Sequence, residues 1–198
     1  MNPIERFCYQ ACSCQREGSS LTLTIDTPVM LTKIKSDLQA YKMSSISIIK
    51  GYFTGHCFFC VLMYRVGNLL ACKRVRFLPD VITSRMREKF ACEISSYATI
   101  DGGLKVLHSP GIVIGHQVII GKNCELFQNV TIGSNRRIRN GREMPIIGDN
   151  VSIYTGAVVV GGIHIGNNVK IGANAYVDYD VPDNSIIYGY KGALHKTN

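Results

Sequence analysis

The residues from Ile147 to Val177 read IGDNVS-IYTGAV-VVGGIH-IGNNVK-IGANAY-V when they are divided into groups of six, and every group opens with isoleucine or valine. The same spacing extends back toward the N-terminus, with two interruptions. Thirteen aliphatic residues share it: Ile94, Ile100, Val106, Ile114, Ile120, Leu126, Ile132, Ile147, Ile153, Val159, Ile165, Ile171 and Val177. This period matches neither an α-helix nor a plain alternating strand.

A six-residue period predicts a solenoid in which three short strands, joined by tight turns, make one triangular coil. The aliphatic residue that opens each group points inward and stacks on its equivalent one coil away. Glycine or a small polar residue supplies the turns, where positive φ is needed. We therefore expect a mainly β fold, a left-handed parallel β-helix of hexapeptide repeats preceded by a small α-helical region. The alternative is an ordinary β-sandwich with coincidental spacing.

The two interruptions of the repeat predict where function lies. Ile114 follows Val106 by eight positions instead of six, so the segment from Leu107 to Val113 must bulge. Ile147 follows Ile132 by fifteen positions, so Ser134–Pro145 must leave the coil as a loop. Loops on rigid scaffolds are where binding and catalytic residues gather.

The remaining sequence divides into further segments. Before the repeat, helical patterns are expected around Asp37–Lys42, over Ser47–Leu70 and over Ile82–Phe90. The repeat is expected to end at Pro182-Asp-Asn184. The expected organisation is an N-terminal extension (1–30), an α-helical region (31–91), the β-helix (92–188) with its protruding loop (134–145), and a basic C-terminal tail (189–198).

The composition narrows the class of partner. The formal charge is +8, which favours an anionic partner such as nucleic acid, a membrane surface or a phosphate-rich ligand like coenzyme A. No nucleic-acid-binding motif is present, so we expect no nucleic acid partner. The apolar stretch Cys57–Cys72 is too short to span a bilayer and contains Arg65. Peripheral membrane contact through the apolar segment Phe58–Leu70 is left open.

The cysteines and the N-terminus predict a cytoplasmic protein. The start of the sequence lacks the basic and apolar regions of a signal peptide, and eight cysteines without export are expected to be reduced thiols. Cys8, Cys12 and Cys14 lie close together, but no second Cys/His pair completes a zinc spacing. We expect no metal site.

One histidine stands out among five. His108 lies in the predicted bulge, and Glu93 precedes it by fifteen residues, about one coil of the solenoid. The two side chains are therefore expected on neighbouring coils, where a carboxylate can fix the tautomer of an imidazole that acts as a general base. The alternative is a histidine and a glutamate on the surface of the coil. His116 and His164 sit at turn-facing positions and are interpreted as surface residues.

Three stretches resemble serine acetyltransferases: Glu93–Gly115 (EISSYATIDGGLKVLHSPGIVIG), Gln128–Gly133 (QNVTIG) and Pro145–Val151 (PIIGDNV). The upstream pair Tyr64-Arg65 also resembles the helical part of that family. The resemblance covers the chain from about Leu31 to Gly189. It implies a homotrimer, with acetyl-CoA bound in a groove between adjacent β-helices and active sites between subunits.

The resemblance also implies roles for particular residues. His108 falls on the catalytic base and Glu93 on its orienting acid, with direct attack of the acceptor hydroxyl on the thioester. The coenzyme contacts that it implies are Gly133, Ser134, Thr155 and Ala173. Lys191 is a candidate to contact a phosphate group of the coenzyme.

Departures from the family concern the acceptor. The resemblance implies an aspartate before the histidine, and an Arg-His pair before the proline of the long loop, as the groups that hold serine. This sequence has Leu107, Glu143 and Met144 at those positions. A further serine-binding aspartate falls near Lys42. These differences predict that serine is not the preferred acceptor, because a desolvated amino acid needs its charges paired.

The pattern is also similar to the sugar O-acetyltransferase branch of polysaccharide biosynthesis, the colanic-acid type. The sequence therefore favours an acetyl-CoA-dependent O-acetyltransferase that acts on a hydroxyl of a sugar or glycan precursor. Leu107 and Met144 would line the acceptor site, and Asn135, Arg136 and Arg142 of the loop would bind an acidic or phosphorylated sugar. Two alternatives are a serine O-acetyltransferase of cysteine biosynthesis and a non-catalytic β-helix scaffold or binding module.

Overall fold

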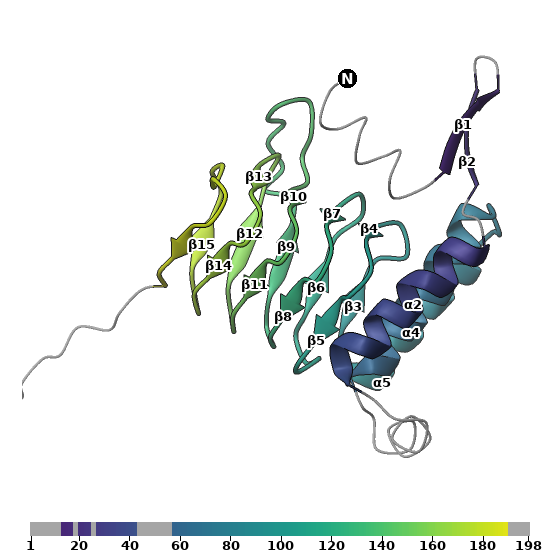
Figure 1. Cartoon of the computed structure of the whole chain (residues 1–198), viewed down its shortest axis with the longest axis horizontal. Coiled ribbons are helices and arrows are strands. Elements are labelled where there is room, and N and C mark those ends of the chain that lie inside the picture. The colour runs from purple at the N-terminus through teal and green to yellow at the C-terminus, as the bar shows by residue number, and fades with distance from the viewer. Residues whose placement is uncertain (1–12, 18–19, 25–26, 43–56, 190–198) are drawn as a thin grey trace, which may run out of the picture.

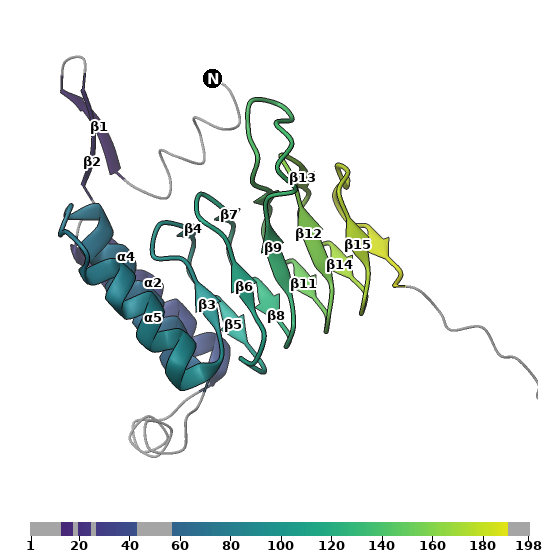
Figure 2. The same cartoon turned by 180° about the vertical axis from the view of Figure 1, so that it is seen from behind.

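A layer of helices lies across one end of a long solenoid of short strands (Figure 1 and Figure 2). The computed structural model describes residues 13–17, 20–24, 27–42 and 57–189. The strands of the solenoid form three parallel sheets, and apart from the last strand each sheet takes every third strand along the chain. The predicted fold, a left-handed parallel β-helix of hexapeptide repeats with a small helical region before it, is confirmed.

Among the described residues, three helices make up the helical layer: α2 (Thr27–Tyr41), α4 (Phe58–Cys72) and α5 (Leu78–Phe90). A hairpin of β1 (Ser13–Glu17) and β2 (Ser20–Thr24) precedes them. Residues 47–56 of the expected second helix lie outside the described residues. Helix α5 begins four residues earlier than expected because Pro79 occupies its first turn, where proline's fixed φ suits a helix and its missing N–H costs nothing.

The β-helix contains fourteen strands. Sheet I holds β3 (Glu93–Ile94), β6 (Val113–Ile114), β9 (Thr131–Gly133), β12 (Val158–Val160) and β15 (Tyr176–Val177). Sheet II holds β4 (Thr99–Ile100), β7 (Ile119–Ile120), β10 (Ile146–Ile147) and β13 (His164–Ile165). Sheet III holds β5 (Lys105–Val106), β8 (Glu125–Leu126), β11 (Ser152–Ile153), β14 (Lys170–Ile171) and β16 (Ile186–Ile187).

The thirteen aliphatic residues of the repeat form the core. Each is at most 1% exposed, and within each sheet they are in register one coil apart, as Ile114 is with Ile132. The repeat does not end at Pro182-Asp-Asn184. Strand β16 follows it and pairs Ile187 with Ile171, so the last face of the solenoid gains one more strand.

Asparagine supplies most of the left-handed turns. Asn123, Asn150, Asn168 and Asn184 stack at one corner with φ between 55° and 59°. Their side-chain amides join from coil to coil at 3.1, 3.2 and 2.9 Å. Asparagine tolerates this conformation better than most residues do, and here the ladder also satisfies its amide.

The glycines that follow the core residues have a different role from the one expected of them. Gly121 and Gly148 are not among the positive-φ residues. A Cβ at Gly121 would lie 2.8 Å from the carbonyl group of Gly148, and one at Gly148 would lie 2.8 Å from that of Gly166. These positions need glycine because backbones of successive coils approach closely there.

Helix α4 packs its apolar face into the core. Phe58, Phe59, Val61 and Tyr64 are all buried. This face of the apolar segment Phe58–Leu70 is therefore covered by the core, whereas Val66 of the same segment is exposed, and peripheral membrane contact stays a prediction. Of the helices described, none has the length and apolarity that crossing a bilayer requires.

A buried ion pair joins the helical layer to the first coil. Arg65 on α4 and Asp37 on α2 are each 1% exposed, with Nε–Oδ2 at 2.9 Å. The Asp37 carboxylate also accepts hydrogen bonds from the backbone N–H groups of Gly103 and Leu104, at 2.8 and 2.9 Å. The Arg65 guanidinium donates to the carbonyls of Ile100 and Asp101, both at 2.6 Å. No coil precedes the first one, so its backbone N–H and C=O groups lack partners on that side. The ion pair supplies the hydrogen bonds that a preceding coil would have made.

Two tyrosines, the buried Tyr64 and the half-buried Tyr41, also satisfy backbone groups of the first coil beside this pair. The Tyr64 hydroxyl donates to the Ala98 carbonyl and accepts from the Ile100 N–H. The Tyr41 hydroxyl donates to the carbonyl of Val106 and accepts from its N–H. Burial raises the pKa of both phenols, so both stay protonated and keep their donor.

Replacing Asp37 tests this capping role. Asp37→Ala leaves the Arg65 charge buried without its partner and two N–H groups without an acceptor, so the free energy of unfolding should fall by about 3–5 kcal/mol. Chemical denaturation monitored by circular dichroism measures the change. Asp178→Ala, at an exposed position, is the matched control and should change stability by less than about 0.5 kcal/mol. Equal losses in the two variants would contradict the capping role.

Candidate active site

The predicted site residues lie along two corners of the triangular solenoid, one at each margin of sheet I. We call the corner between sheets III and I the histidine edge, formed by residues 107–112, 127–130, 154–157 and 172–175. We call the corner between sheets I and II the loop edge, formed by residues 115–118, 134–145 and 161–163.

The predicted bulge is present on the histidine edge and is held by backbone hydrogen bonds on both sides. Gly111 donates its N–H to the Ala91 carbonyl at 2.8 Å, and the Pro110 carbonyl accepts from Asn129 at 3.0 Å. Ser109 is buried, whereas the side chain of His108 is exposed. The extra residues of the bulge therefore present an imidazole to the outside from a fixed backbone.

Glu93 opens strand β3 beside this bulge, with its N–H bonded to the Ile112 carbonyl at 2.8 Å. Its carboxylate pairs with Arg87 of α5, Nε to Oε2 at 3.1 Å, and both side chains are partly exposed. Within the part of the chain that the structure describes, Glu93 and His108 do not share a hydrogen bond. Their pairing stays a prediction, since catalytic hydrogen bonds often form only when substrate is bound.

Three further predicted residues share the histidine edge: Leu107, Thr155 and Ala173. The Leu107 carbonyl accepts a long hydrogen bond from the Cys57 thiol at 3.6 Å. Thr155 is half-buried and Ala173 is exposed on the following coil. Beside them the rings of Phe127 and Tyr154 stack with centroids 4.9 Å apart. The edge thus combines small residues with an aromatic strip.

Gln128 is a residue of the histidine edge that sequence reasoning did not single out. Its side-chain oxygen Oε1 is buried and has no hydrogen-bond partner among the described residues. Its backbone carbonyl accepts from Gly156, which places Gln128 on the coil between the bulge and Thr155. A buried carbonyl oxygen calls for a donor. The resembling stretch QNVTIG contained this residue, but nothing in the repeat marks its side chain as unpaired.

Gly133 and Ser134 lie on the loop edge instead. Unlike the glycines packed between coils, Gly133 borders open space, with no atom within 4 Å of where a Cβ would stand. The backbone at Gly133 is therefore accessible to a ligand that runs along it. Ser134 donates its hydroxyl to Glu143 at 3.2 Å and accepts from the Arg136 N–H at 2.7 Å, which closes the base of the loop.

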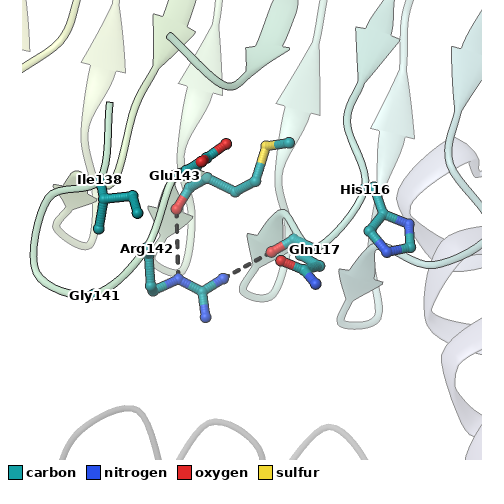
Figure 3. Close-up of a pocket in the computed structure, with 7 residues that line it drawn as sticks. His116, Gln117, Ile138, Gly141, Arg142 and Glu143 are labelled. Carbon is teal, nitrogen blue, oxygen red and sulfur yellow. Dashed lines mark hydrogen bonds between the residues drawn. The ribbon is translucent and has the colours of Figure 1, made fainter. Parts of the chain in front are cut away.

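A cavity of about 430 Å³ opens under the loop, lined by His116, Gln117, Ile138, Gly141, Arg142, Glu143 and Met144. Figure 3 shows the Arg142 side chain lying between the loop and Gln117. Its guanidinium donates to the Gln117 carbonyl at 2.7 Å and to the Met144 carbonyl at 3.5 Å. The cavity therefore brings together Arg142 and Met144, two predicted acceptor-site residues, with the neighbouring Glu143.

His116, interpreted from sequence as a surface residue, also lines this cavity. Its ring contacts that of Tyr97, with centroids 4.9 Å apart. Asn135 and Arg136 belong to the same loop but are not among the residues that line the cavity. The Asn135 side chain accepts a hydrogen bond from the Arg137 N–H at 3.0 Å, and Arg136 is exposed. Lys191 lies outside the described residues.

The predicted site is thus divided within one chain. Leu107, His108, Thr155 and Ala173 belong to the histidine edge, whereas Gly133, Ser134, the loop and the cavity belong to the loop edge. Neither Leu107 nor His108 lines the cavity. The cavity of one chain therefore does not include the histidine edge of the same chain.

Comparison with known proteins identifies similar sequences and structures. A family model described as bacterial transferase hexapeptide (six repeats) matches residues 144–178. Serine acetyltransferase of Helicobacter pylori is 35% identical over 131 residues, which are 66% of this chain and 76% of the relative. The enzyme of the same name from Synechococcus elongatus is 33% identical over 137 residues, 69% of this chain and 56% of the relative.

Solved structures agree with the sequence matches. Soybean serine acetyltransferase complexed with serine has a TM-score of 0.73 and 32% identity, and the alignment covers 82% of this chain and 67% of that one. The chain spans between 56% and 68% of the length of the first three curated relatives.

Gly111 provides a test of the bulge that carries His108. Its φ is +75°, and a Cβ there would run into the Asn129 side chain. Gly141 has a similar φ of +72° but open space around it, so it is a matched control. Gly111→Ala should lower the free energy of unfolding by about 1–3 kcal/mol more than Gly141→Ala does. Equal effects in denaturant titrations would show that the bulge tolerates the added methyl group.

Proposed function

Because the chain belongs to the serine acetyltransferase family, we propose that it transfers the acetyl group of acetyl-CoA to the hydroxyl of L-serine. The observation that carries this proposal is the 34–35% identity to serine acetyltransferases of which the chain covers 68–76%. The exposed His108 on a fixed bulge supplies the base that such a reaction needs.

The sugar acceptor expected from the sequence is wrong, and with it the assignment to polysaccharide biosynthesis. The matched proteins are serine acetyltransferases, among them a solved structure with bound serine. The structure also weakens the reasoning that led to a sugar. Arg139 pairs with Asp180 at 3.0 Å, and Arg142 bonds backbone carbonyls. Arg139 is therefore engaged within the chain and is not presented to an acidic glycan, whereas Arg142 is anchored at the wall of the cavity and lines it.

The proposed reaction is direct acyl transfer. The imidazole of His108 removes the proton from the serine hydroxyl as the oxygen attacks the thioester carbonyl, and it later protonates the departing CoA thiolate. Glu93 exchanges its bond to Arg87 for one to His108, which fixes the tautomer and stabilises the imidazolium. The Arg87–Glu93 pair is partly exposed, so giving it up costs little.

This chain must hold the amino acid with groups of its own, because Leu107, Glu143 and Met144 replace the serine contacts that the family resemblance implies. The cavity offers both charges that a zwitterion requires. Arg142 is suited to the α-carboxylate and Glu143 to the α-ammonium group.

The proposal includes a homotrimer in the cytoplasm whose active sites lie between chains. A trimer that packs the histidine edge of one chain against the loop edge of the next joins the two halves of the site. Acetyl-CoA would then lie in the groove, with Thr155 and Ala173 on one wall and Gly133 and Ser134 on the other. The open space at Gly133 supports this path, because a pantetheine arm can run directly along the backbone there.

Release of free CoA thiol tests the acceptor and the base together. The wild-type chain should release CoA from acetyl-CoA when L-serine is added, and not when sugars or nucleotide sugars are added. His108→Ala should lower turnover with serine by about 10²- to 10⁴-fold, the usual worth of a general base, while acetyl-CoA still binds. Glu93→Gln should cost less.

His164→Ala is the matched control, because His164 is also exposed on the β-helix but lies on sheet II. Its turnover should equal that of wild type. Unchanged turnover in His108→Ala would remove that residue from the mechanism, and release of CoA with sugars in place of serine would contradict the proposed acceptor.

A further inference from the structure

The connection between α4 and α5 exposes apolar side chains beside positive charges. Phe77 is 70% exposed, Val81 is 44% exposed and Leu78 is 40% exposed. The residues before them include three exposed cations, Lys73, Arg74 and Arg76. We call these six residues the basic tip. It lies at the end of the helical layer from which hairpin β1–β2 also departs (Figure 1).

The cations of the basic tip form no ion pairs with the described residues of the chain. No ion pair within the described residues involves Lys73, Arg74 or Arg76, whereas Arg65, Arg85, Arg87 and Arg139 each pair with a carboxylate. The nearest acid in sequence, Asp80, lies 3.5 Å from the hydroxyl of Tyr97. The tip therefore carries a local excess of positive charge.

The backbone holds Phe77 outward at a conformational cost. Its φ is +49°, in the left-handed region that bulky residues rarely adopt. Arg74 has a φ of +56°, so the connection contains two such residues. Glycine or asparagine would relieve this strain. Strained residues that expose a large apolar ring point to a use at the surface.

The base of the tip is firmly anchored. Pro79 is buried, and its carbonyl accepts hydrogen bonds from the hydroxyls of Ser96 at 3.0 Å and Thr83 at 3.1 Å. Ser96 belongs to the first coil of the β-helix, so the helical layer and the solenoid hold the start of α5 together. The apolar and basic side chains therefore project from a rigid support.

We propose that the basic tip docks on an anionic phospholipid surface, with Lys73, Arg74 and Arg76 among the headgroups and Phe77 and Leu78 at the boundary with the acyl chains. Cations next to exposed apolar side chains match the two layers of such a surface. A second copy of this chain is a poor occupant, because a two-fold contact through the tip would oppose like charges. Nucleic acid would use the cations but leave Leu78 and Val81 uncovered.

Vesicle co-sedimentation of the full chain tests the proposal. Vesicles of phosphatidylcholine with about one third phosphatidylglycerol should bind the wild type at low salt, and pure phosphatidylcholine vesicles should bind it far more weakly. Arg74→Gln/Arg76→Gln should weaken binding about 25-fold, or about fivefold per charge. Lys122→Gln/Lys170→Gln removes two exposed cations elsewhere on the chain and should leave binding within about twofold of wild type.

Phe77→Asn separates docking from folding. Asparagine accepts left-handed φ, so the melting temperature should stay the same or rise. Vesicle binding should nevertheless fall at least about fivefold, since the apolar ring is lost. Unchanged vesicle binding in both tip variants would overturn the proposal, as would equal binding to neutral and anionic vesicles. Binding of random-sequence duplex DNA through Arg74 and Arg76, without vesicle binding, would also overturn it and assign the tip to nucleic acid.

Discussion

Each coil of the β-helix can bury its aliphatic side chains only against the coils next to it, and this constraint organises the rest of the molecule. It fixes a three-sided cross-section, so every residue of the repeat belongs to a face or to an edge. Departures from the repeat are then confined to edges, where they disturb no core contact. The bulge with His108 occupies one edge and the long loop with Arg142 occupies another. The chemistry of the chain is therefore distributed by the geometry of its coil.

The same constraint explains the buried polar residues of the helical layer. The first coil has no coil before it, so its backbone groups and aliphatic side chains need another partner. Helix α4 covers the side chains, and Arg65 with Asp37 satisfies backbone groups of residues 100–104. A buried ion pair costs much desolvation, and it is tolerable here because nearly every donor and acceptor is used. The helices thus complete the solenoid that carries the site.

Much of the fold could be predicted from the sequence, because the core residues recur every six positions and the bulge and the loop interrupt that period. The cap could not be predicted, since Asp37 meets Gly103 only through tertiary packing. The role of the glycines after the core residues was predicted wrongly. In a sequence, a glycine required by close approach of two coils looks the same as a glycine required by a turn. His108 and Glu93 were proposed from their positions in the repeat, and their roles and their pairing with each other stay predictions. The acceptor was predicted wrongly because Leu107, Glu143 and Met144 show only that the serine contacts implied by the family are missing. The sequence does not show that Arg139 and Arg142 form bonds within the chain.

The central claim is that a working site takes His108 from one chain and Arg142 with Glu143 from its neighbour. Subunit complementation tests it most directly: His108→Ala chains and Arg142→Ala/Glu143→Ala chains, each nearly inactive alone, are unfolded, mixed in equal amounts and refolded together. If sites are shared, a site works when one chain supplies an intact His108 and its neighbour supplies an intact Arg142 and Glu143. Each condition is met with probability one half in an equal mixture, so about a quarter of wild-type turnover with serine should be recovered. Turnover that stays at the level of the separate variants, while size-exclusion and cross-linking show mixed trimers, would contradict the claim and place the whole site within one chain.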